Sequence, residues 1–260
     1  MARVIFPIFF AIIVSLPAIS QGRLAIGFDV ANRKELRNYI DPQGYLHNRY
    51  TPLFALGGVL NYRISDRWEI ESGIYETSFH ETISYYYKEP GYRPLNATGW
   101  QVNGLRTLQI PLRAVYDLNL GFKRLSFNVV GGVSLYNLTS NINRWGETGL
   151  SPIPVYPRPP VNLDLYYQSY PLRKRSLAFE GGVELRYQLS NRMDLIYRYT
   201  RLVGTREMNK MIGYYSIDNP PTQYEFEVTS KGSAIHNTFS LRYNFGKNSK
   251  NIPKYEKFED

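Results

Sequence analysis

Three histidines, His47, His80 and His236, are the side chains of this sequence best suited to acid–base chemistry near neutral pH. A histidine beside a serine or a carboxylate can act as the general base of a hydrolase. Ser78 and Glu81 flank His80. No recognisable motif joins these residues, so we expect histidines without a catalytic role. An enzyme that modifies lipid or peptide is kept as an alternative.

The sequence contains no cysteine, which excludes disulfides and thiolate metal ligands. Three dispersed histidines do not form a metal-binding pattern either. We therefore predict no metal site, no cofactor and no catalytic residue.

The other candidates for chemistry are ionisable side chains that recur at every second position of several segments. Side chains two residues apart lie on the same face of a β-strand. Acids and arginines placed in this way can pair, because the planar guanidinium matches a carboxylate. The predicted ion-pair network comprises Asp29, Arg63, Glu69, Glu71, Arg113, Asp117, Glu180, Glu184, Arg186, Asp194, Arg198 and Arg242.

The strands that must position these residues are indicated by an alternation of apolar and polar residues along the sequence. In Ser176–Leu189, one face carries only apolar or glycine residues, while Glu180, Glu184 and Arg186 lie on the other. This is the pattern of a strand with two unlike faces. The predicted strands are Leu24–Val30, Phe54–Ile64, a strand that begins at Trp68, Leu105–Leu118, Leu125–Leu138, Ser176–Leu189, Met193–Arg201 and Ile235–Phe245.

The connections between these strands alternate in length. Short turns are expected near residues 65–67, 119–124 and 190–192, and long loops near 31–53, 79–104, 139–175 and 202–234. Membrane barrels show this asymmetry, with short periplasmic turns and long external loops. The predicted fold is all-β: an eight-stranded antiparallel up-and-down transmembrane β-barrel with long extracellular loops.

The direction of the apolar face separates this barrel from a soluble one, whose apolar face points inward. The apolar faces carry almost no charge, and a lipid-facing Arg or Lys at the bilayer midplane costs roughly 2–4 kcal/mol. Aromatic residues also lie on these faces near the short turns, as at a headgroup interface. This predicted aromatic girdle consists of Tyr62, Trp68, Tyr116, Tyr187, Tyr243 and Phe245.

The charged face would then point into the lumen. An eight-stranded barrel is just wide enough for side chains to fill, so we predict a plugged interior, with a proton or ion path through the carboxylates as the alternative. Three Gly-Gly-Val repeats, at 57–59, 131–133 and 181–183, are expected to leave room for bulky lumen neighbours. Pro111 has no N–H to donate to a neighbouring strand. We therefore expect either a bulge at this position or an error in the predicted register of the strand.

Both ends of the chain are predicted to lie outside the barrel domain, residues 21–245. Residues 1–20 have the pattern of a signal peptide, with Arg3, an apolar run and the small residues Ala18 and Ser20 before the cleavage point. Residues 246–260 are predicted to be a periplasmic C-terminal tail. The formal net charge is +9, but no dense basic run is present, so nucleic acid is not expected as a partner.

Short phrases in the strands resemble outer-membrane β-barrel proteins of the Bacteroidota. They are Leu108–Leu112, Tyr62–Ile70 and Gly131–Leu135. That group includes PorT-like proteins and is similar in architecture to OmpA- and OmpX-type barrels. The resemblance implies an outer-membrane location, makes Pro111 a habit of the family and transfers no catalytic residue. The last strand, with Leu241, Tyr243 and Phe245, resembles the signal read by the barrel-assembly machinery.

We therefore expect a non-enzymatic, multi-pass protein of the outer membrane that acts through its extracellular loops as a structural, adhesive or assembly component. The alternative is an accessory subunit of a protein-secretion or surface-assembly system. The expected partners are outer-membrane lipid and lipopolysaccharide, the barrel-assembly machinery, and a secretion-system or surface protein.

Overall fold

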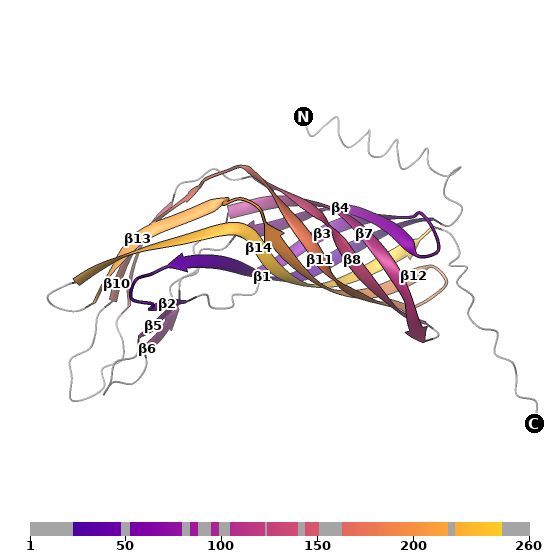
Figure 1. The fold of residues 1–260 in the computed structure, drawn as a ribbon, viewed down its shortest axis with the longest axis horizontal. Coiled ribbons are helices and arrows are strands. Elements are labelled where there is room, and N and C mark those ends of the chain that lie inside the picture. The colour runs from indigo at the N-terminus through magenta and orange to yellow at the C-terminus, as the bar shows by residue number, and fades with distance from the viewer. Residues whose placement is uncertain are drawn as a thin grey trace, which may run out of the picture.

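The computed structural model describes residues 23–47, 53–79, 84–87, 95–98, 105–122, 124–139, 144–150, 163–217 and 222–245. Its barrel strands (Figure 1) are β1 (Leu24–Ile40), β3 (Leu53–Arg63), β4 (Trp68–Phe79), β7 (Leu105–Phe122), β8 (Leu125–Leu138), β11 (Arg175–Gln188), β12 (Met193–Gly204) and β14 (Thr222–Asn244). Each strand pairs antiparallel with the next in this order, and β14 pairs with β1 to close the barrel. The predicted eight-stranded antiparallel barrel is confirmed.

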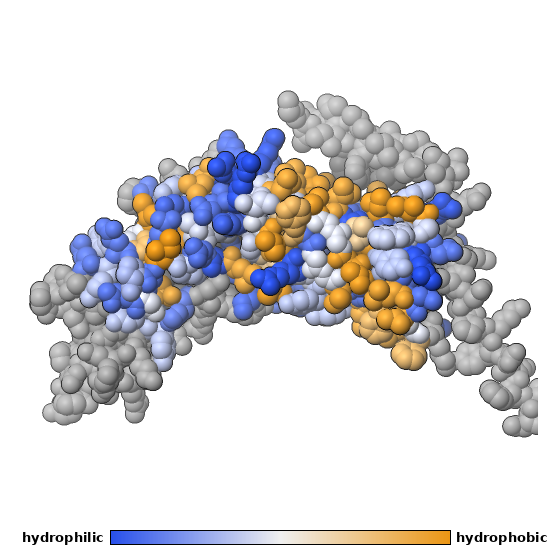
Figure 2. Space-filling view, viewed as in Figure 1, coloured by the Kyte–Doolittle hydropathy of each residue, from blue (hydrophilic) through white to orange (hydrophobic). Residues whose placement is uncertain are grey.

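The barrel turns its apolar stripes outward. Phe28, Leu112 and Phe179 are 54%, 55% and 61% exposed, whereas Asp29 and Glu71 are fully buried. Figure 2 shows apolar side chains over much of the barrel surface. Such a surface suits lipid and not water. The apolar face of each strand therefore points outward, as in a transmembrane barrel. The described residues contain no helix that is long and apolar enough to cross a membrane.

Pro111 lies within β7 and causes no bulge. It faces Ser134 of β8 without a register shift, and the ladder between β4 and β7 opens only between the Ser72–Leu112 and Tyr75–Gln109 pairs. The Ser72 hydroxyl donates to the Pro111 carbonyl oxygen at 2.9 Å. The expected bulge is therefore wrong, because the missing N–H interrupts one ladder locally without adding a residue.

Two real irregularities lie elsewhere in the barrel. The β7–β8 register shifts between Asp117 and Leu120, beside Asn119 with its positive φ of 56°. The β1–β14 register shifts between Glu35 and Arg37, opposite Gly232, whose φ is 79°. A left-handed backbone favours glycine at such a bulge. The second shift marks the level at which the sheet leaves the barrel.

The long connections lie at one end, as predicted, but the structure corrects their description as loops. They contain β2 (Leu46–His47), β5 (Ser84–Tyr87), β6 (Leu95–Thr98), β9 (Arg144–Leu150), β10 (Leu163–Pro171) and β13 (Asn209–Ile217). Strands β2, β5 and β6 form a small separate sheet, while β9, β10 and β13 continue the barrel sheet beside β14. We call β9, β10 and β13, with residues 222–230 of β14 and 37–40 of β1, the extension (Figure 1, left).

One face of the extension has its own apolar core. Leu165, Tyr167, Met211, Tyr215 and Phe226 pack there with Val228 and with Leu46 of β2. Burial of this face explains why these segments form strands without a lipid belt. The predicted signal peptide, residues 1–20, and the predicted tail, residues 246–260, lie outside the described residues.

The Gly-Gly repeats divide into an inward and an outward glycine. A Cβ at inward Gly57 would lie 2.4 Å from the Tyr75 ring, and one at Gly182 would lie 2.1 Å from the Tyr199 carbonyl oxygen. A Cβ at outward Gly58 would meet nothing within 4 Å. The inward glycines therefore let a bulky lumen ring or a neighbouring strand approach closely.

We predict that Gly57→Ala lowers the free energy of unfolding by about 1–3 kcal/mol, the cost of overpacking a filled interior. The added methyl would displace Tyr75, whose hydroxyl donates to Asp29 at 2.5 Å. Urea unfolding of the protein in lipid vesicles measures the change. Gly58→Ala is the matched control and should leave the stability within about 0.5 kcal/mol. Equal losses in the two variants would show that lumen packing does not decide the effect.

Candidate functional site

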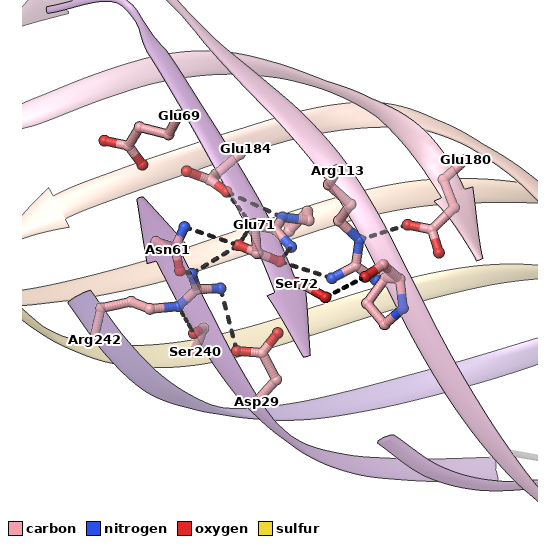
Figure 3. A network of polar contacts seen from close by, with 12 residues as sticks. Asp29, Asn61, Glu69, Glu71, Ser72, Arg113, Glu180, Glu184, Ser240 and Arg242 are labelled. Carbon is pink, nitrogen blue, oxygen red and sulfur yellow. Dashed lines mark hydrogen bonds and ion pairs between the residues drawn. The ribbon is translucent and has the colours of Figure 1, made fainter. Parts of the chain in front are cut away.

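Glu71 of β4 lies at the centre of the lumen and binds three arginines (Figure 3). Its Oε1 accepts hydrogen bonds from Arg113 Nη1 at 2.8 Å and Arg198 Nη1 at 2.6 Å. Its Oε2 accepts from Arg198 Nη2 at 2.8 Å and Arg242 Nη1 at 2.7 Å. These arginines come from β7, β12 and β14, so one carboxylate joins four strands across the interior.

Each of these arginines also binds a second acid. Arg113 Nε lies 2.5 Å from Glu180, Arg198 Nε lies 3.0 Å from Glu184, and Arg242 Nη2 lies 3.4 Å from Asp29. All of these side chains are buried. A buried charge needs a partner and satisfied hydrogen bonds, and this arrangement supplies both.

The network continues to the turn end of the barrel. Arg186 donates to Glu69 at 2.8 and 2.7 Å and to Glu184 at 2.9 Å, and Arg63 donates to Glu69 at 3.3 Å. Linked salt bridges thus connect Asp29, Arg63, Glu69, Glu71, Arg113, Glu180, Glu184, Arg186, Arg198 and Arg242.

Two members of the predicted network have other partners. Asp117 accepts a hydrogen bond from the Asn119 backbone N–H at 2.8 Å, at the register shift within β7. Asp194 accepts from the Asn244 side chain at 3.0 Å. Asp194 is the second residue of β12, and Asp117 lies in the half of β7 toward the turn end.

An apolar cluster fills the lumen at the other end of the network. Phe79, Leu105, Tyr136, Leu138, Ala178, Leu202 and Met208 form it, from the strand ends next to the extension. Arg33 lies buried beside it with its guanidinium 4.7 Å from the Phe79 ring centroid. In the described part of the chain, ion pairs and then apolar side chains therefore occupy the interior in succession.

Several lumen residues escaped the sequence prediction. Arg33 lies in a predicted loop because the first predicted strand ends at Val30, whereas β1 continues to Ile40. Tyr75 and Tyr136 point inward, and Arg113 donates to the Tyr75 hydroxyl at 2.9 Å. The position of Tyr75 four residues after Glu71 was a usable signal, since even spacing in a strand gives the same face.

The three histidines do not share a described site. His236 is buried in the lumen on β14, opposite Arg33 and Thr200. His47 of β2 is exposed, with its ring 5.9 Å from that of Tyr86. His80 lies outside the described residues. No group of three or more His, Asp or Glu that could hold a metal occurs within the described ranges.

The predicted girdle residues lie on the outer surface at the turn end. The Trp68 and Tyr116 rings are 4.8 Å apart, and those of Tyr243 and Phe245 are 5.5 Å apart. Tyr62 and Tyr187 are exposed at the same level of their strands. Arginines of the turns reach two of the hydroxyls, Arg67 at Tyr116 (3.4 Å) and Arg192 at Tyr243 (3.2 Å). Leu241, of the predicted assembly signal, is also exposed on β14 beside Tyr243 and Phe245.

The extension carries a groove of about 940 Å³, lined mainly by residues of the face opposite its core and in part by the core residues Tyr167 and Phe226. Ladder pairing puts Tyr166, Tyr214 and Glu225 in one row, and Gln168, Ile212, Glu227 and Ile40 in the next. The Tyr166 and Tyr214 rings stack with centroids 5.0 Å apart. Lys210 donates to Glu227 at 2.7 Å, and this hydrogen bond raises the pKa of Lys210 above its ordinary value. The sequence does not predict the groove, because the segments that form it are expected to be loops.

No protein-family model and no curated protein matches this sequence. Among solved structures, the fold is similar to the outer membrane protein OprG from Pseudomonas aeruginosa, at 12% identity over 87% of this chain and 97% of that chain, with a TM-score of 0.45. It is similar to the N-terminal β-barrel domain of Pseudomonas aeruginosa OprF, at 11% identity over 86% and 100%, with a TM-score of 0.40. Neisserial surface protein A is similar at 13% identity over 85% and 97%, also with a TM-score of 0.40.

Proposed function

We propose that this chain is an integral outer-membrane protein that does not conduct solutes and acts by binding a partner protein at its extension. It would serve as an adhesive or assembly component and not as an enzyme. The observation that carries the proposal is the groove on the extension, which is formed by paired strands outside the barrel.

The filled lumen supports the non-conducting part of the proposal. Glu71 and its arginines bridge the barrel at mid-height, and the Phe79 and Tyr136 cluster packs next to the extension. A solute would have to break several buried ion pairs to pass. In planar bilayers we expect no large steady conductance, and the appearance of one would contradict this part of the proposal.

The chemistry of the groove supports a protein partner. Stacked tyrosines offer a rigid surface that is apolar along the ring and polar at the hydroxyl, which is why tyrosine is enriched in protein interfaces. Exposed Ile40 and Ile212 lie beside them. Glu225 adds a negative charge on a chain that is basic overall, while Glu227 is paired with Lys210. This combination suits a partner segment with an apolar side chain next to a lysine or arginine.

We predict that Tyr166→Ser combined with Tyr214→Ser abolishes capture of the partner. The tagged full-length protein is extracted from its own membranes with a gentle detergent, and bound proteins are identified by mass spectrometry. Tyr187→Ser, at the turn end, is the matched control and should retain the partner. Loss of the partner in both variants, or in neither, would contradict binding at the groove.

The same capture separates the two roles. A secretion or assembly subunit bound only by the wild type and by the control variant would identify an accessory role, whereas a surface protein would identify an adhesive one. Normal folding of each variant is checked by its heat-dependent migration in gels.

A further inference from the structure

Buried polar atoms without hydrogen-bond partners among the described residues occur in the lumen where the Glu71 network meets the apolar cluster. They belong to Arg33, Thr77, Gln109, Tyr136 and His236, on five different strands. We propose that they form a binding site for one small inorganic anion of the size of chloride. The proposal is independent of the groove.

Arg33 is the cation of this site. It is fully buried, and only its Nη1 has a partner, the Ser78 carbonyl oxygen at 2.8 Å. Its Nε and Nη2 have none among the described residues. Its guanidinium lies over the Phe79 ring and 5.8 Å from the Tyr136 ring. Arginine stays charged in protein interiors. Among the described residues, no acid forms a salt bridge with this guanidinium.

Two buried acids of the interior, Glu35 of β1 and Glu180 of β11, are already engaged. Glu35, two residues after Arg33, pairs with Arg37 at 3.3 Å and accepts a hydrogen bond from Ser230. Glu180 pairs with Arg113 and accepts hydrogen bonds from Ser134 and Gln109. Neither forms an ion pair with Arg33 in the described structure, so the compensating charge has to come from elsewhere.

The other members converge on Arg33 from the facing strands. His236 is its direct partner on β14, and Tyr136 lies under its guanidinium. Gln109 faces Tyr136 across the β7–β8 ladder, and Thr77 is on the same inward face of β4 as Phe79. These side chains are at most 3% exposed. They are therefore held close together inside a sealed interior.

The unpartnered atoms are mostly hydrogen-bond donors. Arg33 Nε and Nη2 can only donate, the Tyr136 and Thr77 hydroxyls can each donate, and His236 Nε2 can carry a hydrogen. Gln109 Oε1 is the one acceptor, and it can take a hydrogen from a neighbouring hydroxyl or from a water. A surplus of donors around a fixed cation selects an anion over water, since buried polar atoms are paired in nearly all folded proteins.

The surroundings limit the size of the anion. The Phe79 and Tyr136 rings close one side, and Gly232 at the β14 bulge lies so close that a Cβ there would be 3.1 Å from the Tyr136 ring. A monatomic anion meets these walls better than a multiatomic oxyanion does. Because the site is sealed, the anion would enter as the barrel closes.

Crystals of the full chain folded and grown in bromide test the site directly. We expect an anomalous peak within hydrogen-bond distance of Arg33 Nε and Nη2. Ordered water alone, that is density without an anomalous signal at this position, would overturn the proposal.

A solution test uses the protein refolded into vesicles in chloride or in gluconate at equal ionic strength. Chloride at ten times its dissociation constant should raise the midpoint of thermal unfolding by about 3–5 °C. Arg33→Met should remove the difference between the salts, while Arg206→Met, an exposed arginine at the same end, should preserve it. An equal chloride effect in Arg33→Met would overturn the proposal. If that variant does not fold, Thr77→Val, which removes one donor, should at least halve the shift, and an undiminished shift would count against the site.

Discussion

Replacement of Glu71 by glutamine is expected to lower the free energy of unfolding by about 3–5 kcal/mol, as for a buried ion pair that loses one partner. Arg113, Arg198 and Arg242 all bind this carboxylate, and all three are buried. Glutamine keeps the shape of the side chain and removes its charge. The variant would therefore hold three arginines around a neutral group. Urea unfolding in lipid vesicles measures the loss.

Glu76→Gln is the matched control for this prediction. Glu76 lies on the same strand, five residues on, with its side chain exposed on the outer face. The same substitution there should change stability by no more than about 0.5 kcal/mol. Similar values for the two variants would mean that the Glu71 network does not stabilise the barrel.

Leu112→Arg is expected to cost about 2–4 kcal/mol, the penalty for a cation that faces lipid at the bilayer midplane. Leu112 is 55% exposed on the outer face of β7, next to Arg113 at the level of Glu71. Leu118→Arg, on the same face but beyond the girdle residue Tyr116, should cost only about 0–1 kcal/mol. Both are measured by urea unfolding in vesicles. Equal costs at the two depths would be incompatible with a lipid belt centred near Leu112.

The sequence predicts barrel strands well where one face meets lipid and the other a polar lumen. The bounds of β8, Leu125–Leu138, agree with the prediction, and those of β11 differ by one residue at each end. Beyond the lipid, the outer face no longer has to be apolar. In β1, Asn32 and Lys34 follow Val30 on the outer face, so the alternation disappears although the strand continues to Ile40.

The same reason explains the strands missed in the extension. Tyr166 and Tyr167 lie on opposite faces of β10, one toward the groove and one in the core. Tyrosine suits both surfaces, so hydrophobic periodicity could not reveal the strand. A strand that carries the same residue type on both faces is identified only by its pairing.

The alternation within each strand correctly predicts that most of these charged side chains point into the lumen. It does not predict which acid pairs with which arginine. That Glu71 binds Arg242 depends on the stagger of β4 against β14, which lie on different sides of the closed sheet. Sequence spacing within a strand does not contain this stagger, because the shear of a barrel is a property of the whole ring. Arg33 differs from these residues. It continues the alternation of inward-facing positions in β1, but the predicted strand ends before it, at Val30.

The distribution of these contacts along the chain has a consequence for assembly. Arg242 belongs to the last strand, and its partners Asp29 and Glu71 belong to the first and third strands of the barrel. Asp29 thus gains its arginine, and Glu71 the third of its three, only when the end of the chain arrives. We expect an unclosed intermediate to keep these acids hydrated, and closure of the seam to expel that water as it forms the ion pairs. Completion of the barrel is then a single cooperative step. A chain that lacks its last strand is expected to have no stable lumen.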